Sequence, residues 1–251
     1  MSFSLLIDAL AIPDDARVEL RVPKKLLAEQ GAPTAADKRQ IQDGIEEITW
    51  VAALKPTNIG VPAYRDDARE YLEVAVLTAV FRPEARAGRL LELIHRAIPY
   101  PVVLVSEDDD GLSLSLAHKR WSQGESGAVV VEDCRKVTIP PGDPSPWEQA
   151  FLGSLAVSQL PARDLYAFYG GLLKRLAALE AARITGAFAP PDSVERAAAV
   201  RAGLDERRRI ERELATLRAQ VKREKQLNRR VELNLQIKRL ETQLDKVSSQ
   251  L

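Results

Sequence analysis

The sequence is poor in the residues that metal sites and nucleophilic sites need. Its 251 residues include one cysteine, Cys134, and two histidines, His95 and His118. A single cysteine excludes a disulfide framework and zinc clusters built on cysteine. Two histidines leave little room for histidine-rich metal sites or for a triad of nucleophile, histidine and carboxylate. The sequence therefore predicts no metal and no cofactor, and it does not specify a reaction.

Long apolar runs and signature loops are also missing. No stretch of about 18 apolar residues is present, so we expect no membrane span. Residues 1–13 are apolar, but Asp8 interrupts them and no basic segment precedes them, which argues against a signal peptide. With a lone cysteine, this favours a cytoplasmic protein. The chain also has no phosphate-binding Gly-x-x-x-x-Gly-Lys-Ser/Thr loop, no Gly-x-Ser-x-Gly elbow and no His-Glu-x-x-His motif.

Charge is present in quantity but cancels. The chain has 36 Lys and Arg against 36 Asp and Glu, which gives a net charge of zero. Residues 193–251 hold 15 cationic and 9 acidic side chains, a net charge of +6, so residues 1–192 carry −6. The sequence thus describes an acidic body followed by a basic C-terminal region.

Proline marks two boundaries, at 139–146 and 186–192. They divide the chain into an expected mixed α/β domain at 1–139, a helical hairpin at 145–186 and a long basic helix of coiled-coil type at 192–251. In the hairpin, Ser145 and Glu148 form a capping box for a helix expected to reach Leu160. A second helix is expected to follow, with Gly186 at its C-terminal end.

The first domain combines both kinds of periodicity. We expect a helix at 35–47, a strand at 48–54, a central strand buried on both faces at 70–81, a helix at 83–98 and a buried strand at 101–106. The order strand–helix–strand over 70–106 predicts one parallel crossover.

Two further strands should extend this sheet as antiparallel hairpins. Residues 112–121 alternate strictly, which predicts one buried and one exposed face, and residues 128–139 form the next strand, with turns at 107–111 and 122–127. The fold class predicted is α/β or α+β, a mixed sheet with flanking helices.

The C-terminal region contains neither Gly nor Pro from Leu204 to Leu251. As one helix it would be about 70 Å long. One heptad seam holds Ile210, Leu214, Leu217 and Val221, and the other holds Leu233, Ile237, Leu240, Leu244, Val247 and Leu251. The two seams differ in register, so the pattern shifts across 222–232, either as a stutter or as a change from one partner to another. We expect an interaction surface at Leu233, Ile237, Leu240 and Leu244, and a possible homo-oligomer through 204–251.

The same region is the candidate nucleic-acid interface. Residues 207–230 hold ten basic and three acidic side chains, and the candidates for phosphate contact are Arg207, Arg208, Arg209, Lys222, Arg223, Arg229 and Arg230. The alternative is the solvated flank of a coiled coil, where Arg and Lys are common. Aromatic residues are absent there, so base stacking is not expected.

Acidic residues offer two weaker candidates. The segment 107–111 could hold a cation through carboxylates, although Asp-Gly is also ordinary turn chemistry. Glu73 stands alone in an apolar strand and, with the strand order, suggests a nuclease core, the only catalytic candidate found. Such cores need Glu-x-Lys, whereas Ala75 occupies the lysine position. The alternative is a carboxylate near an exposed strand end.

The end of the alternating strand, His118–Trp121, is a candidate contact surface. Lys119 and Trp121 fall on the face of Ser113 and Ser115, which is expected to be exposed, and Arg120 lies between them. A tryptophan beside cations is typical of protein contacts. His118 falls on the leucine face and is expected to be a core or edge histidine.

Several segments together resemble the bacterial domain of unknown function 4391. They are Arg21–Lys25, Ile48–Trp50, Leu54–Ile59, Glu70–Phe81, Ile98–Pro101, Lys119–Trp121 and Arg230–Lys238. None of them is a catalytic motif, so the resemblance depends on their order along nearly the whole chain. The resemblance implies that the gene for this protein lies beside genes for helicases and DNA methyltransferases in restriction or anti-phage clusters.

Three hypotheses follow. The first is a non-enzymatic accessory or assembly subunit of such a DNA-acting system, working through contacts with a helicase or methyltransferase type protein encoded nearby. The second is a nuclease-like or degenerate nuclease subunit. The third is direct DNA binding by the basic helix at 207–230.

Overall fold

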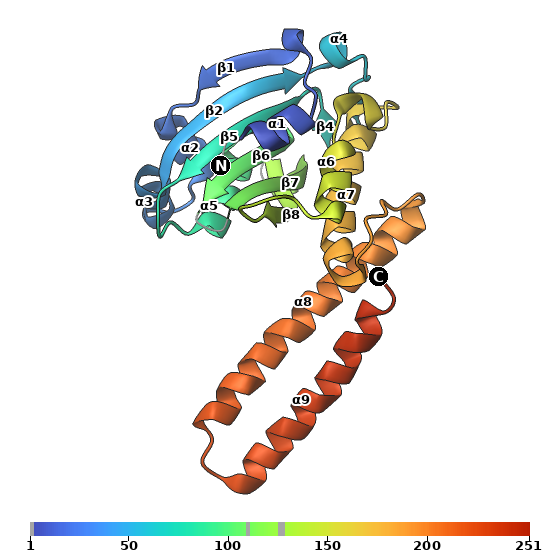
Figure 1. Cartoon of the computed structure of the whole chain (residues 1–251). Helices are drawn as coiled ribbons and strands as arrows, with labels where there is room; N and C mark the ends of the chain where they lie inside the picture. Colours follow the sequence, from blue (N-terminus) through green and yellow to red (C-terminus); the bar gives the residue numbers. More distant parts are fainter. Residues whose placement is uncertain (1–2, 109–110, 125–128) are drawn as a thin grey trace. The chain divides into compact units, whose positions relative to one another are not determined.

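A computed structural model describes residues 3–108, 111–124 and 129–251 of the chain (Figure 1). The chain divides into two compact units, Met1–Leu176 and Ala177–Leu251. We call the first the body and the second the hairpin unit. The division falls within helix α7 (Leu165–Thr185), so the helical region expected at 145–186 contributes to both units.

The body is built on a six-stranded mixed sheet of order β1-β2-β5-β6-β7-β8. Its strands are β1 (Arg17–Arg21), β2 (Ile45–Leu54), β5 (Val74–Phe81), β6 (Val102–Asp108), β7 (Gly111–Trp121) and β8 (Val129–Ile139). Strands β5 and β6 are parallel, and every other neighbouring pair in this sheet is antiparallel. The predicted mixed sheet, its single crossover and its antiparallel extension are confirmed.

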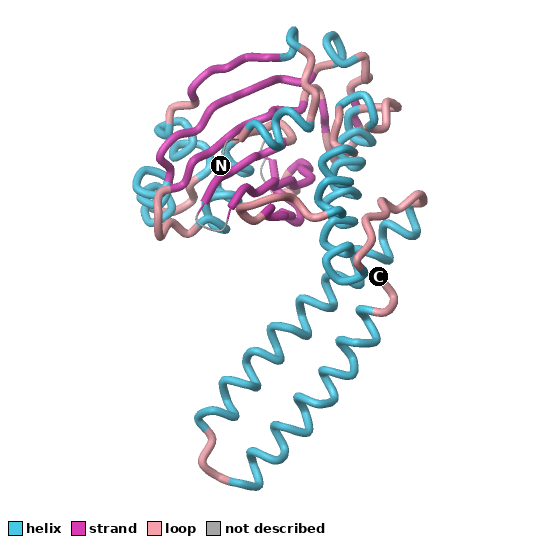
Figure 2. Tube along the Cα trace, viewed as in Figure 1, coloured by secondary structure: helices cyan, strands magenta, loops and turns pink. Residues whose placement is uncertain are grey.

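Helices cover one face of this sheet closely (Figures 1 and 2). Helices α2 (Lys24–Gly31), α3 (Ala35–Gly44) and α5 (Ala87–Ala97) share a continuous core with β2, β5 and β6. Gly31 lets α2 approach α5, because a Cβ there would lie 2.6 Å from the Cβ of Ala97. Helix α1 (Ser4–Ala9) lies on the opposite face, where it borders an open cavity.

Short elements complete the body. They are η1 (Asp14–Ala16), α4 (Pro56–Ile59), the two-stranded ribbon of β3 (Tyr64–Arg65) and β4 (Glu70–Tyr71), α6 (Pro146–Gly153) and η2 (Val157–Gln159). The capping box of Ser145 and Glu148 is present at the start of α6. That helix ends at Gly153, short of the expected Leu160, because a 3-10 turn follows.

Several predicted boundaries are wrong. The strand expected at 70–81 is interrupted after Tyr71, so Glu73 precedes β5. Helix α3 ends at Gly44 because Ile45 already pairs with Phe81 across the sheet. Helix α5 begins at Ala87, after Pro83 rather than on it.

The predicted turns lie partly outside the described residues. In the acidic turn at 107–111 this holds for Asp109 and Asp110, and in the turn at 122–127 it holds for residues 125–127. Gly111 starts β7 with a φ of +126°, a backbone conformation that favours glycine.

The single long helix expected in the C-terminal region is also wrong. The structure has two antiparallel helices, α8 (Val194–Arg223) and α9 (Leu227–Ser248), joined by residues 224–226 (Figure 2). The two heptad seams pack against each other in a small core of Ile210, Leu214, Leu217, Leu240, Ile237, Leu244 and Val247. The register shift at 222–232 therefore marks the turn of the chain. No helix in the described parts of either unit is long and apolar enough to cross a membrane.

Candidate functional site

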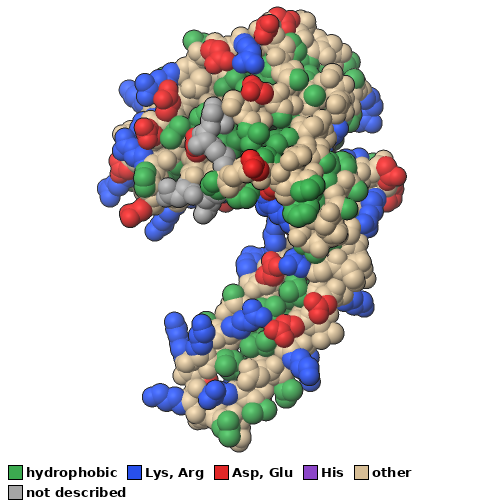
Figure 3. Space-filling model, viewed as in Figure 1, with side chains coloured by type: hydrophobic (Ala, Val, Ile, Leu, Met, Phe, Trp, Pro, Cys, Tyr) green, Lys and Arg blue, Asp and Glu red, His purple; other side chains and the backbone are tan. Residues whose placement is uncertain are grey.

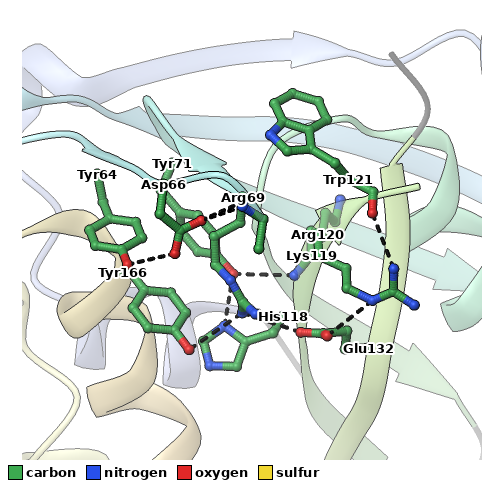
Figure 4. A network of polar contacts seen from close by, with 11 residues as sticks. Tyr64, Asp66, Arg69, Tyr71, His118, Lys119, Arg120, Trp121, Glu132 and Tyr166 are labelled. Atoms are coloured by element: carbon green, nitrogen blue, oxygen red, sulfur yellow. Dashed lines mark hydrogen bonds and ion pairs between the residues drawn. The ribbon is translucent and has the colours of Figure 1, made fainter. Parts of the chain in front are cut away.

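A cluster of tyrosines surrounds His118 near the end of β7 (Figure 4). The hydroxyl of Tyr71 accepts a hydrogen bond from the backbone N–H of Lys119 and lies 2.7 Å from His118 Nδ1. The ring of Tyr166 lies 4.9 Å from that of His118 and meets Tyr71 edge-on. Burial raises the pKa of Tyr71, which keeps its hydroxyl protonated. Its proton is therefore available for the bond to His118.

Charged groups surround this cluster and are paired with one another. Arg69 lies over the ring of Tyr166 and also bonds Glu132, at 3.2 Å. The other oxygen of Glu132 lies 3.3 Å from Nε of Arg120. Asp66 accepts hydrogen bonds from Tyr64 and from the N–H of Arg69. The arrangement ties the β3–β4 ribbon and α7 to the sheet, and its polar groups are occupied in doing so.

This cluster was not predicted from the sequence. Its aromatic members are Tyr64, Tyr71, His118, Tyr166 and Tyr169, from four elements that only the fold brings together. No local spacing signals such a cluster. The one partial signal was His118 itself, a histidine at a position of the strand where the alternation places a leucine.

Lys119 is buried, contrary to the expectation of an exposed side chain. Only 3% of the residue is accessible, and its Nζ donates to the carbonyl oxygens of Ile98 and Tyr100, just after α5. Its neighbours Ser113 and Ser115 are fully buried as well. The predicted exposed face is wrong because α5 covers it and the serines find hydrogen-bond partners on other elements. Burial lowers the pKa of Lys119 to about 7.

A small cavity lies beside Lys119 at the end of the strand. It has a volume of about 220 Å³, and Leu72, Tyr100, Arg120 and Trp121 contribute to its lining. Trp121 is half-buried, and its backbone N–H bonds the carbonyl of Ala68. Of the three residues expected at a contact surface here, Arg120 and Trp121 are partly accessible.

A second group of buried polar side chains lies under α5. His95 Nε2 is 2.8 Å from the hydroxyl of Ser115, which is 3.4 Å from the sulfur of Cys134. Burial, with the nearby Lys119, lowers the pKa of His95 to about 3, and burial raises the pKa of the Cys134 thiol. Within the described residues, His95 Nδ1 has no hydrogen-bond partner. The imidazole of His95 is therefore neutral and the thiol of Cys134 is protonated. An activated nucleophile would instead be a thiolate.

Glu73, the catalytic candidate, forms an ion pair with Lys55 at 3.3 Å. Its side chain is 12% exposed, and it lies in the break between β4 and β5. Across residues 3–108, 111–124 and 129–251, no group of three or more His, Cys, Asp and Glu side chains could hold a metal ion.

Residues 193–251 carry their net positive charge at one end of the hairpin unit. We call residues 215–239, which surround the turn at 224–226, the hairpin tip. It contains eight cationic side chains and two acidic ones, a net charge of +6, so the remainder of 193–251 is neutral. Figure 3 shows cationic and hydrophobic side chains together over this end.

The DNA-binding candidates fall into two groups. Arg207, Arg208 and Arg209 form ion pairs within the unit, with Glu211, Glu180 and Glu206 respectively, and Arg229 pairs with Glu232. In the described part of the chain, Lys222, Arg223 and Arg230 form no ion pair, and all three are exposed. Of the seven candidates, the three without an ion pair therefore all lie at the tip.

The apolar residues of α9 also fall into two groups. Leu233 and Leu240 are buried, and Leu240, Ile237 and Leu244 belong to the core shared with α8. The expected interaction surface is thus filled by the chain's own helix. Three other apolar residues, Leu227, Val231 and Leu235, are 70%, 52% and 54% exposed. We call these three residues the outer stripe.

The fold and these sites define a mixed α/β domain that carries an antiparallel helical hairpin with a basic, partly apolar tip. The chain belongs to the family described as domain of unknown function DUF4391, whose sequence model matches residues 10–244. The match covers both the body and the hairpin unit. Neither the curated proteins nor the solved structures contain a match to the chain.

Proposed function

We propose that this protein is a non-enzymatic accessory or assembly subunit of a bacterial DNA-acting system of restriction or anti-phage type, and that the hairpin tip docks onto another protein. The outer stripe carries the proposal. Helix α9 is apolar on two faces, and its own chain covers one of them. Exposed apolar side chains that lie in a row mark interaction sites.

The body supports this proposal in a different way. The polar groups of the tyrosine cluster bond one another and hold the ribbon and α7 to the sheet. Lys119 bonds two backbone carbonyls, and Glu73 bonds Lys55. These residues hold the body together, whereas the hairpin tip combines exposed, unpaired cations with an exposed apolar row.

Co-expression with the adjacent helicase and methyltransferase type genes tests the proposal. A tag on this chain should co-purify one of those proteins. Replacing the outer stripe, Leu227, Val231 and Leu235, by serine should abolish the co-purification. A matched control replaces three exposed leucines of the body, Leu20, Leu26 and Leu72, which are 63%, 48% and 49% exposed. Loss of the partner in the control alone would contradict the proposal.

A second candidate function is direct DNA binding by the tip. The observation that favours it is the concentration of the net charge of +6 within residues 215–239. Retention of duplex DNA should then fall steeply with salt. Reversing Lys222, Arg223 and Arg230 to Glu should abolish it, whereas reversing the ion-paired Arg207, Arg208 and Arg209 should weaken it less. Retention that is unchanged by the first set would exclude this function.

A further inference from the structure

We infer that the occupant of the outer stripe is an acidic amphipathic helix of a partner protein. This inference rests on the proposed docking function and adds the chemistry of the partner. It follows from where the apolar residues lie on α9, from the charges beside them and from the absence of aromatic residues in 193–251.

The outer stripe lies on the side of α9 that faces away from α8. Successive residues of a helix are separated by about 100°. Leu227, Val231 and Leu235 therefore fall within an arc of about 80°. Leu240, which belongs to the core shared with α8, and the buried Leu233 lie roughly on the opposite side of the helix. A partner can thus cover the stripe without opening the hairpin.

Cations border the stripe on both sides and at one end. By the same spacing, Arg230 lies on one flank, Arg239 on the other, and Lys238 continues the line of the stripe. All three are exposed and, within the described residues, without an ion pair. Glu232 also lies on a flank but is paired with Arg229 at 2.7 Å. A partner with a row of apolar side chains between acidic flanks would complement this pattern.

A second copy of the chain does not fit this surface. Pairing two outer stripes would bring together two tips that each carry a net charge of +6. Like charges placed opposite each other oppose such a contact. An acidic partner would be attracted to the positively charged tip instead of being repelled by it. The charge of the tip therefore favours an acidic partner over a second copy.

Nucleic acid and membranes fit less well than an acidic helix. Phosphates would pair with the cations, but three aliphatic side chains would be left against the backbone of the nucleic acid. Residues 193–251 contain no Phe, Trp or Tyr. They therefore lack both the rings on which bases stack and the aromatic residues typical of helices at a membrane surface.

The first experiment titrates the full chain into a labelled synthetic helix with leucines at i, i+4 and i+7 and glutamates on both flanks. Two control peptides keep the leucines with lysine flanks, or the glutamates with serine in place of leucine. We expect the acidic leucine peptide to bind at least tenfold more tightly than either control, and its binding to weaken with salt. Equal binding of the lysine peptide, or binding only to duplex DNA or to anionic phosphatidylserine vesicles, would overturn the inference.

Variants then locate the binding site. Replacing Leu227, Val231 and Leu235 by serine, or making Arg230→Glu with Arg239→Glu, should each weaken the acidic peptide at least tenfold. Lys38→Glu with Arg39→Glu, at exposed positions of α3, changes net charge equally and should leave binding unchanged. An effect of the α3 pair as large as that of the α9 pair would show that only overall charge matters and would refute the site.

The two proposals can fail separately. If the stripe variant loses its neighbour-encoded partner while the acidic peptide does not bind, the docking function stands and the partner chemistry is wrong. If the peptide binds at the stripe while the variant still co-purifies the neighbour, the surface chemistry stands and the proposed function is wrong.

Discussion

The body and the hairpin unit use polar and apolar residues in opposite ways. The body buries polar groups, including Lys119, His95 and Ser115, and provides most of them with partners inside the fold. The hairpin tip keeps unpaired cations at the surface beside the three exposed aliphatic side chains of the outer stripe. A buried polar group with a partner stabilises the fold, whereas an exposed apolar row contributes little to it. This difference supports the proposal that the hairpin tip is the docking surface of the protein.

Truncating one leucine in each region should give the largest contrast. Leu104 is fully buried in β6, so Leu104→Ala should lower the free energy of unfolding by about 2–5 kcal/mol. Leu235 is 54% exposed, and Leu235→Ala should change it by less than about 0.5 kcal/mol. Urea denaturation measures both. Similar losses for the two variants would mean that the outer stripe is buried, and the comparison would fail.

The core of the hairpin should respond locally. Ile210 is fully buried between α8 and α9, so Ile210→Ala should cost about 2 kcal/mol within this unit. Hydrogen exchange should show faster amides in α8 and α9 and unchanged amides in β5 and β6. Equal acceleration in the body would show that the two units unfold together.

Much of the fold could be predicted because it depends on local patterns. The Val-rich run at 74–81, a helix and the run at 102–105 leave few alternatives to a parallel crossover. The hairpin turn was missed because residues 224–226 contain neither Gly nor Pro. Glu224 stabilises this turn by accepting a hydrogen bond from the N–H of Gln226. The heptad pattern showed a shift of register where the turn lies, but it did not show that a turn causes the shift.

The candidate sites were harder to predict because their members meet only in the fold. The alternation of leucine and serine in β7 predicted an exposed face. In the structure, Ser113 bonds Thr138 and Ser115 bonds His95, so both faces are covered. Burial of Lys119 follows from the same cover and cannot be read from its own strand. The exposure of the outer stripe could be judged only once the structure showed which face of α9 is buried, the face that carries Leu233 and Leu240.

The burial of Lys119 should appear in the pH dependence of stability. Its pKa is about 7 in the folded chain and 10.5 when unfolded, so the unfolded state binds more protons between these values. The free energy of unfolding should therefore rise with pH from about 7 to 10. In Lys119→Met this contribution disappears, and the slope of stability against pH should become flatter over that range. An unchanged slope would show that Lys119 is accessible to solvent and charged.

Removing one hydroxyl tests how firmly the tyrosine cluster holds the body. Tyr71→Phe removes the acceptor of the buried N–H of Lys119 and one bond of His118, so it should cost about 1–2 kcal/mol. Tyr64→Phe removes an exposed bond to Asp66 and should cost less than about 0.5 kcal/mol. Thermal denaturation of both variants at pH 7 measures the difference. A larger loss for Tyr64→Phe would place the stabilising bonds at the ribbon rather than at β7.

Ion pairs should give the smallest effects and complete the contrast. The pair of Arg229 and Glu232 at the tip is more than half exposed on both sides, so Glu232→Gln should change stability by less than about 0.5 kcal/mol. Glu132 is one-third exposed and joins Arg69 to Arg120 in the body, so Glu132→Gln should cost more. Urea denaturation at low and high salt measures both. If the tip pair cost more, the charges there would serve the fold of the hairpin. A negligible change in the free energy of unfolding would mean that folding does not need these charges. They would then be available for contact with a partner.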